Sequence, residues 1–177
     1  MKPSVRKIVS GGQTGVDRAG IDFAIAHGID YGGWVPKGGI AEDMKVPPGL
    51  LAHYSMLQEA PTTSMSARTK LNVRDSDATL IIRPHGGVMS PGTKLTINLC
   101  GQLKKPYVVI DPNDWDGAEQ LGEFLKMVEE QIDSGTGVAI ALNVAGPRES
   151  KSRGIYDAAT GLLAESLDTV VYVTASS

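Results

Sequence analysis

Three glycine-rich turns are the part of this sequence best suited to chemistry. The first comprises Gly11, Gly12, Gln13, Thr14 and Gly15, and it stands between a β-branched run at 7–10 and a helical pattern over 16–27. Glycines let the backbone approach a ligand closely, and the start of the following helix offers free N–H groups and the positive end of its dipole. This order predicts a cradle for a phosphate or nucleotide-like ligand, with a tight turn that binds nothing as the alternative.

The standard fingerprints are absent from this turn. It is not a full G-x-G-x-x-G, and no G-x-x-x-x-G-K-[ST] occurs in the chain. Asp17 follows in the first helical turn, where it binds a ligand hydroxyl or amine or stabilises the helix dipole. Arg18 is a further candidate, although pairing with a carboxylate is the favoured interpretation.

The other two turns come after later strand patterns. In the segment 86–93, Ser90, Pro91, Gly92 and Thr93 open a helix and predict a second anion site, with simple capping by Ser90 as the alternative. In the segment 145–148, Gly146 and Arg148 follow the end of a predicted strand. Arg148 is therefore expected to bind a phosphate through two hydrogen bonds, or else to form a surface ion pair.

Further positive and polar residues are expected to face the same ligand. Arg68, Thr69 and Asn72 share one face of a predicted helix, which points into the cleft or into solvent. Lys37 and Gly38 lie in a glycine- and proline-rich loop that supplies positive charge, and residues 36–63 are expected to shield the ligand.

A metal site is not expected. His27, His53 and His85 are far apart in the sequence, without cysteine or histidine at ligand spacing. The single cysteine, Cys100, falls on an apolar helix pattern and is expected in the core.

Alternating strand and helix patterns must position these residues. Strands are predicted at 7–10, 29–35, 78–82, 106–110, 137–144 and, at an edge, 169–173. Helices are predicted at 16–27, 66–74, 91–100, 115–132 and 155–167. Residues 41–63 are expected to be mostly irregular. This alternation predicts a single Rossmann-like α/β/α domain over residues 1–177, with three layers and a mostly parallel sheet. Ligands of such sheets bind outside the carboxyl ends of the strands, where all three glycine turns fall.

The composition argues against nucleic acid and membranes as binding partners. The 177 residues carry a formal net charge of −3 and have a pI near 5.6, so an overall positive field for nucleic acid is lacking. The apolar runs are too short for a membrane span, and the N-terminal residues show no signal-peptide pattern. The expected compartment is the cytoplasm, and the expected partner is a phosphate-bearing small molecule.

These motifs resemble a known family. The chain is similar to the molybdenum-cofactor carriers, also described as circularly permuted YpsA-like proteins of the SLOG superfamily, at residues 11–19 (GGQTGVDRA), 34–39 (WVPKGG), 41–43 (AED), 68–69 (RT), 72–73 (NV), 75–77 (DSD), 90–93 (SPGT) and 105–107 (KPY). The resemblance implies a Rossmann-like fold, a homo-oligomer (dimer or tetramer), and the molybdenum cofactor (molybdopterin) or another nucleotide-like ligand as cargo. Relative to LOG-type phosphoribohydrolases, the module at 142–148 comes last instead of first.

One departure from those hydrolases bears on catalysis. Their motif P-G-G-x-G-T-x-x-E ends in a glutamate that works with an arginine on the preceding helix, and Arg68 matches that arginine. The glutamate position holds Thr96, which cannot ionise. The leading hypothesis is therefore a carrier without catalytic residues. The alternatives are a nucleotide hydrolase in which Asp17, Glu42 or Asp43 replaces the glutamate, and a sensor of nucleotides or ADP-ribose derivatives.

Overall fold

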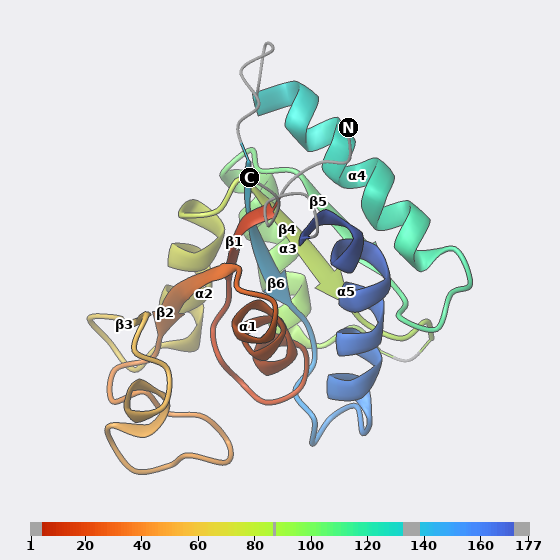
Figure 1. Cartoon of the computed structure of the whole chain (residues 1–177). Helices are drawn as coiled ribbons and strands as arrows, with labels where there is room; N and C mark the ends of the chain where they lie inside the picture. The colour runs from red at the N-terminus through yellow and green to blue at the C-terminus, as the bar shows by residue number, and fades with distance from the viewer. Residues whose placement is uncertain (1–4, 87, 133–138, 172–177) are drawn as a thin grey trace.

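A computed structural model describes residues 5–86, 88–132 and 139–171 (Figure 1). In chain order the elements are β1 (Val5–Val9), α1 (Val16–Ala26), β2 (Asp30–Val35), the 3-10 helix η1 (Gly49–Ala52), β3 (Leu57–Glu59), α2 (Met65–Arg74), β4 (Ala78–Ile82), α3 (Pro91–Gln102), β5 (Tyr107–Ile110), α4 (Gly117–Ile132), β6 (Ile140–Ala145) and α5 (Ile155–Val171). The alternation of strand and helix predicted from the sequence is confirmed.

The strands form one sheet in the order β3-β2-β1-β6-β4-β5, and every pairing between neighbours is parallel. The predicted Rossmann-like α/β fold is thus confirmed. The last of these strands in the chain, β6, lies in the middle of the sheet, where Ile8 pairs with Leu142 and Leu80 pairs with Val144.

Helices cover both faces of the sheet (Figure 1). Helices α1, α4 and α5 pack on one face, where Phe23, Leu125 and Leu163 join the main hydrophobic core. Helices α2 and α3 pack together on the other face through Val73 and Cys100. Burial from both sides explains the continuous apolar run of β4, in which all five residues are buried.

Two segments differ from the sequence-based prediction. The stretch 41–63, predicted to be mostly irregular, contains η1 and the short strand β3, which pairs with β2 through Trp34 and Gln58. The strand predicted at 169–173 is wrong for residues 169–171, which belong to α5. No glycine or proline follows Gly161 to stop this helix, and adding one more residue to an existing helix is easier than starting a strand. The predicted positions 137, 138, 172 and 173 lie outside the described residues.

The strand order reverses around β6, so that the carboxyl ends of β1, β6 and β4 lie side by side. In a parallel sheet this is where ligands bind. Within the described ranges, none of the helices has the length and apolar character needed to cross a membrane.

Candidate functional site

A cavity of about 750 Å³ opens at the carboxyl ends of β1, β6 and β4. Its walls come from α2, the start of α3, and the loops that follow the three strands. The lining includes the predicted residues Gly11, Asp17, Arg68, Thr69, Asn72, Ser90, Pro91, Gly92, Thr93, Gly146 and Arg148. The three glycine turns therefore meet at one cavity, although they contribute to it unequally.

Arg68 and Asp17 form a buried ion pair in the cavity wall. Arg68 Nη1 lies 3.2 Å from Asp17 Oδ2, and the two side chains are 13% and 5% exposed. Burial raises the pKa of the Asp17 carboxyl, against the lowering effect of Arg68 and of backbone N–H groups of Gln13 and Gly146. The buried Nε of Arg68 has no hydrogen-bond partner in the part of the chain described here, so the guanidinium keeps unused donor capacity beside the cavity.

Gly11 makes this arrangement possible. A Cβ atom at position 11 would stand 1.5 Å from Arg68 Nη1, so the guanidinium occupies the space that any side chain would fill. The absence of a side chain at Gly11 therefore leaves room for Arg68. Gly12 and Gly15 likewise leave room for other parts of the protein.

The rest of the first glycine turn packs against protein. Leu50 lies close behind Gly12, and the backbone of 147–149 lies against Gly15. The helix N–H of Val16 donates to Pro147 O at 3.3 Å, and Thr14 N donates to Gln13 Oε1 at 3.0 Å. Of the five turn residues, Gly11 alone lines the main cavity, so the turn joins loops more than it exposes backbone to a ligand.

The start of α3 is more open to the cavity than the first glycine turn. Ser90 caps the helix by accepting a hydrogen bond from Thr93 N at 3.1 Å, and Pro91 occupies the first turn. Both the predicted capping and the predicted place at the cavity are therefore observed. Because the positive end of the helix dipole faces the cavity wall, this turn favours a negative ligand group.

Positive side chains outnumber negative ones in the cavity lining. Arg68, Arg83, Arg148 and Lys151 line it, and Asp17 is the only carboxylate among the lining residues. Arg83 and Lys151 were not predicted, although each follows a strand end, as ligand-binding residues commonly do. Asn143, also missed, is buried in β6 and donates to Thr79 Oγ1 at 3.2 Å.

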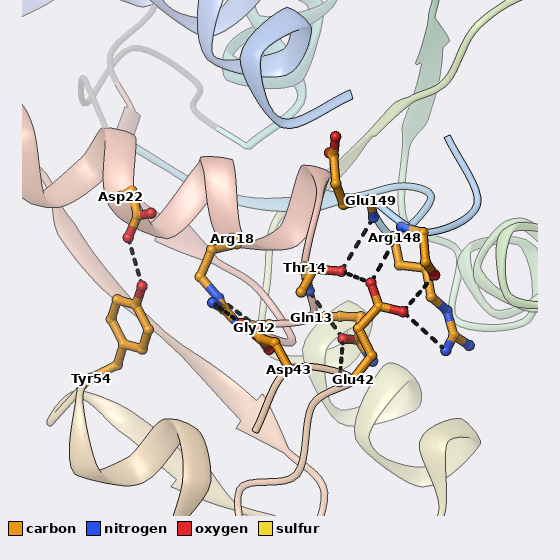
Figure 2. Close-up of polar contacts among 11 residues, drawn as sticks. Gly12, Gln13, Thr14, Arg18, Asp22, Glu42, Asp43, Tyr54, Arg148 and Glu149 are labelled. Atoms are coloured by element: carbon orange, nitrogen blue, oxygen red, sulfur yellow. Dashed lines mark hydrogen bonds and ion pairs between the residues drawn. The ribbon is translucent and has the colours of Figure 1, made fainter. Parts of the chain in front are cut away.

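A polar cluster ties the first turn to the loop after β2 (Figure 2). The Arg18 guanidinium binds Asp43 through two hydrogen bonds of 3.0 Å, as the carboxylate interpretation predicted, and its Nε donates to Gly12 O. Glu42 accepts from the hydroxyls of Thr14 and of Ser150. Arg18 and Thr14 thus hold loops together, and neither residue lines the cavity.

The electrostatics of this cluster stabilise the ionised carboxylates. The hydrogen bond from Arg18 lowers the pKa of Asp43. Burial alone would raise the pKa of Glu42, but hydrogen bonds from Ser150 and Thr14 and the charge of Arg148 outweigh it, so that the pKa is lowered. Arg148 Nη1 lies 3.6 Å from Glu42 Oε2 and remains 44% exposed.

The remaining predicted residues have other contacts. Asn72 accepts from Trp34 N at 2.7 Å and donates to Trp34 O at 3.0 Å, so its amide anchors β2 to α2. Gly38 N donates to Glu59 Oε1 at 2.7 Å. Lys37 and Gln13 line a second hollow of about 800 Å³, which adjoins the main cavity at Met65 and Arg148.

The fold also brings together three potential metal ligands from two separate segments of the sequence. His85, Asp111 and Asp114 place potential ligand atoms within 4.8 Å of one another, where no metal-binding group was predicted. His85 Nε2 is already bonded to one carboxylate at 2.8 Å, and Asp111 accepts from Asn113 N at 2.9 Å. Cys100 is buried, as predicted.

Thr96, the position that the resemblance to LOG-type hydrolases matches to their glutamate, lies in the cavity wall. It is 5% exposed, and its hydroxyl donates to Gly92 O at 3.0 Å. The other acidic candidates for a replacement, Glu42 and Asp43, are engaged with Ser150 and Arg18. The main cavity consequently presents hydrogen-bond donors and positive charge to a ligand.

The sequence and the fold of this chain match known proteins. Residues 8–167 match the model of the circularly permutated YpsA SLOG family. The fold is similar to a crystal structure from Syntrophus aciditrophicus SB named "Putative molybdenum carrier protein", with a TM-score of 0.81, 44% sequence identity, and coverage of 94% of this chain and 98% of that one. No curated protein matches the chain.

Proposed function

Because the chain belongs to the circularly permutated YpsA SLOG family, we propose that it holds and delivers the molybdenum cofactor, bound by its phosphate in the main cavity. The similar protein from Syntrophus aciditrophicus, which is named a molybdenum carrier, supports this cargo. Another nucleotide-like phosphate ligand would use the same groups.

The observation that carries the proposal is the charge of the cavity. The whole chain is acidic, yet four cationic side chains line the cavity against one carboxylate, and Arg68 already neutralises that carboxylate. Positive charge gathered in a hollow attracts and holds an anion far better than the same charge spread over a surface.

The available groups fit a phosphate. The first turn of α3 carries a dipole suited to an anion, and the Arg68 side chain lines the same cavity. Arg83 and Lys151 lie on the loops that follow β4 and β6, so the positive groups of the cavity come from different segments of the chain. The volume of about 750 Å³ lies within the usual range for small-molecule sites, roughly 300–1,000 Å³.

The same wall favours holding a ligand over cleaving it. N-glycosidic hydrolysis depends on a carboxylate next to the reacting carbon. Here Thr96 supplies a hydroxyl that is already bonded to the helix, and Asp17 is buried against Arg68.

Cofactor loading tests the proposal. Purified protein is incubated anaerobically with molybdenum cofactor released from a molybdenum enzyme, desalted, and assayed for molybdenum and phosphorus per chain. We expect the wild type to retain both elements and the Arg83→Glu/Lys151→Glu variant to retain at least tenfold less. Lys70→Glu/Lys126→Glu makes the same change in net charge at exposed lysines outside both hollows and should load normally. Equal retention by all three proteins, or by none, would contradict the proposal.

A further inference from the structure

The main cavity and the second hollow share two residues. Met65 and Arg148 line both, so the two hollows are neighbours that meet at these two side chains. The second hollow is lined by Gln13, Pro36, Lys37, Ile40, Ala41, Glu42, Lys45, Thr63, Met65, Arg148 and Ser150.

The chemistry of the second hollow suits half of a nucleotide-like molecule. Pro36, Ile40, Ala41 and Met65 provide apolar surface against which a planar ring can pack, and Lys37 and Lys45 add two positive charges. Together the two hollows gather six of the chain's 17 lysines and arginines but only two of its 20 carboxylates. The positive field therefore continues beyond the main cavity.

Arg148 lies between the two hollows, and its ion pair with Glu42 is partly exposed to solvent. Its contact with Glu42 is long, at 3.6 Å, and 44% of its side chain is exposed. Glu42 keeps its bonds to Thr14 and Ser150 if the arginine moves away. Guanidinium groups bind phosphate oxygens in pairs, so a phosphate bridge at this junction would have a suitable donor.

We infer that the ligand is bipartite: two ring-bearing halves joined by a pyrophosphate, with one half in each hollow and Arg148 at the bridge. Each hollow is large enough for one half, at about 750 and 800 Å³. This inference rests on the proposed function, because it assigns the main cavity to the first half. It names a dinucleotide-like class of cargo in preference to a mononucleotide.

Titration calorimetry with three probes tests the inference. The probes are guanosine 5′-monophosphate, guanosine 5′-diphosphate and the symmetrical dinucleotide in which two guanosines share a 5′–5′ pyrophosphate. The diphosphate separates the effect of added charge from that of the second base. We expect the dinucleotide to bind at least tenfold more tightly than the diphosphate.

Variants locate the second half. Lys37→Glu/Lys45→Glu changes exposed side chains of the second hollow alone, and it should weaken dinucleotide binding at least tenfold while changing monophosphate binding less than threefold. Lys70→Glu/Lys126→Glu serves as the charge-matched control and should change neither. Circular dichroism verifies that each variant is folded.

The outcomes separate the inference from the proposed function. Equal affinity for the diphosphate and the dinucleotide, or equal sensitivity of all probes to the lysine changes, overturns the bipartite ligand while phosphate binding in the main cavity stands. Failure of every probe to bind a folded protein that also loads no cofactor overturns both.

Discussion

Arg68 reaches across Gly11 to place its Nη1 atom 3.2 Å from Asp17 Oδ2, so that a residue of α2 closes over the turn after β1. This contact joins two segments 51 residues apart and sets the charge of the cavity wall. Breaking a buried ion pair from one side leaves the other charge without compensation. The pair therefore links the stability of the fold to ligand binding, and each link can be tested.

Gly11→Ala should displace the Arg68 guanidinium and weaken its buried ion pair with Asp17, so that stability and ligand affinity fall together. The added methyl group would fall on the flexible end of Arg68, and moving one guanidinium away removes about one charge-assisted hydrogen bond from the ligand. We expect affinity for the loaded cofactor to fall about tenfold, the equivalent of about 1.4 kcal/mol. Gly101→Ala, at an α3 position with open space around it, should leave affinity unchanged. Unchanged binding in Gly11→Ala would remove Arg68 from the site.

Arg68→Met should make stability depend strongly on pH. Without the arginine, Asp17 must be buried unpaired or take up a proton, which lowers the free energy of unfolding by about 3–5 kcal/mol at pH 7. The folded-state pKa of Asp17 is raised, so the folded protein binds the proton more tightly than the unfolded chain. Stability of the variant should consequently rise as the pH falls from 7 toward 5, as measured by urea denaturation. Arg68→Met/Asp17→Asn should lack this rise; its persistence in the double variant would contradict the account.

Asn72→Ala should affect stability more than binding. The substitution leaves Trp34 N–H and C=O without their partners, and an unsatisfied buried group costs about 1–3 kcal/mol. Thermal and urea unfolding should show a loss of about 2 kcal/mol, whereas cofactor affinity of the folded protein should change less than threefold. Asn98→Ala, at an exposed position of α3, is the matched control. A loss of cofactor affinity without a loss of stability would show that Asn72 binds the ligand and would contradict this prediction.

Glu42→Gln should lower stability at neutral pH more than in acid. The folded-state pKa of Glu42 is lowered, so its stabilising effect is present above the unfolded-state value near 4.5 and is lost as the pH falls through the folded-state value. We expect a deficit of about 1 kcal/mol in unfolding free energy at pH 7 that shrinks toward pH 3. Glu123→Gln, on the exposed face of α4, should show no such deficit. An equal deficit at both pH values would mean that the charge of Glu42 is not what holds the loops.

The fold could be predicted from local patterns because a parallel α/β sheet repeats one unit. Continuous apolar strands such as 78–82 alternate with helices, and their carboxyl ends necessarily meet at one edge. The same reasoning placed Arg68 and the turn 90–93 at the cavity. The predicted strand was wrong for residues 169–171, because the continuation of α5 outweighed the strand preference of their β-branched side chains.

The contacts of individual site residues could not be predicted in this way. Gly12 and Gly15 have the composition of an anion cradle, but Leu50 and the backbone of 147–149 occupy the space around them. Trp34 takes both hydrogen-bonding groups of Asn72 across a separation of 38 residues. Such assignments depend on which distant segments pack together, and no spacing within the sequence encodes them.

The central claim is that the cavity holds a phosphate-bearing ligand without cleaving it, and mass spectrometry of freshly purified protein tests it most directly. Small molecules are released from the protein and identified, and the same preparation is then incubated with nucleoside monophosphates and assayed for free base. The account predicts recovery of a pterin or an intact nucleotide and no release of base. An empty protein that liberates base would contradict it and would identify the chain as a hydrolase.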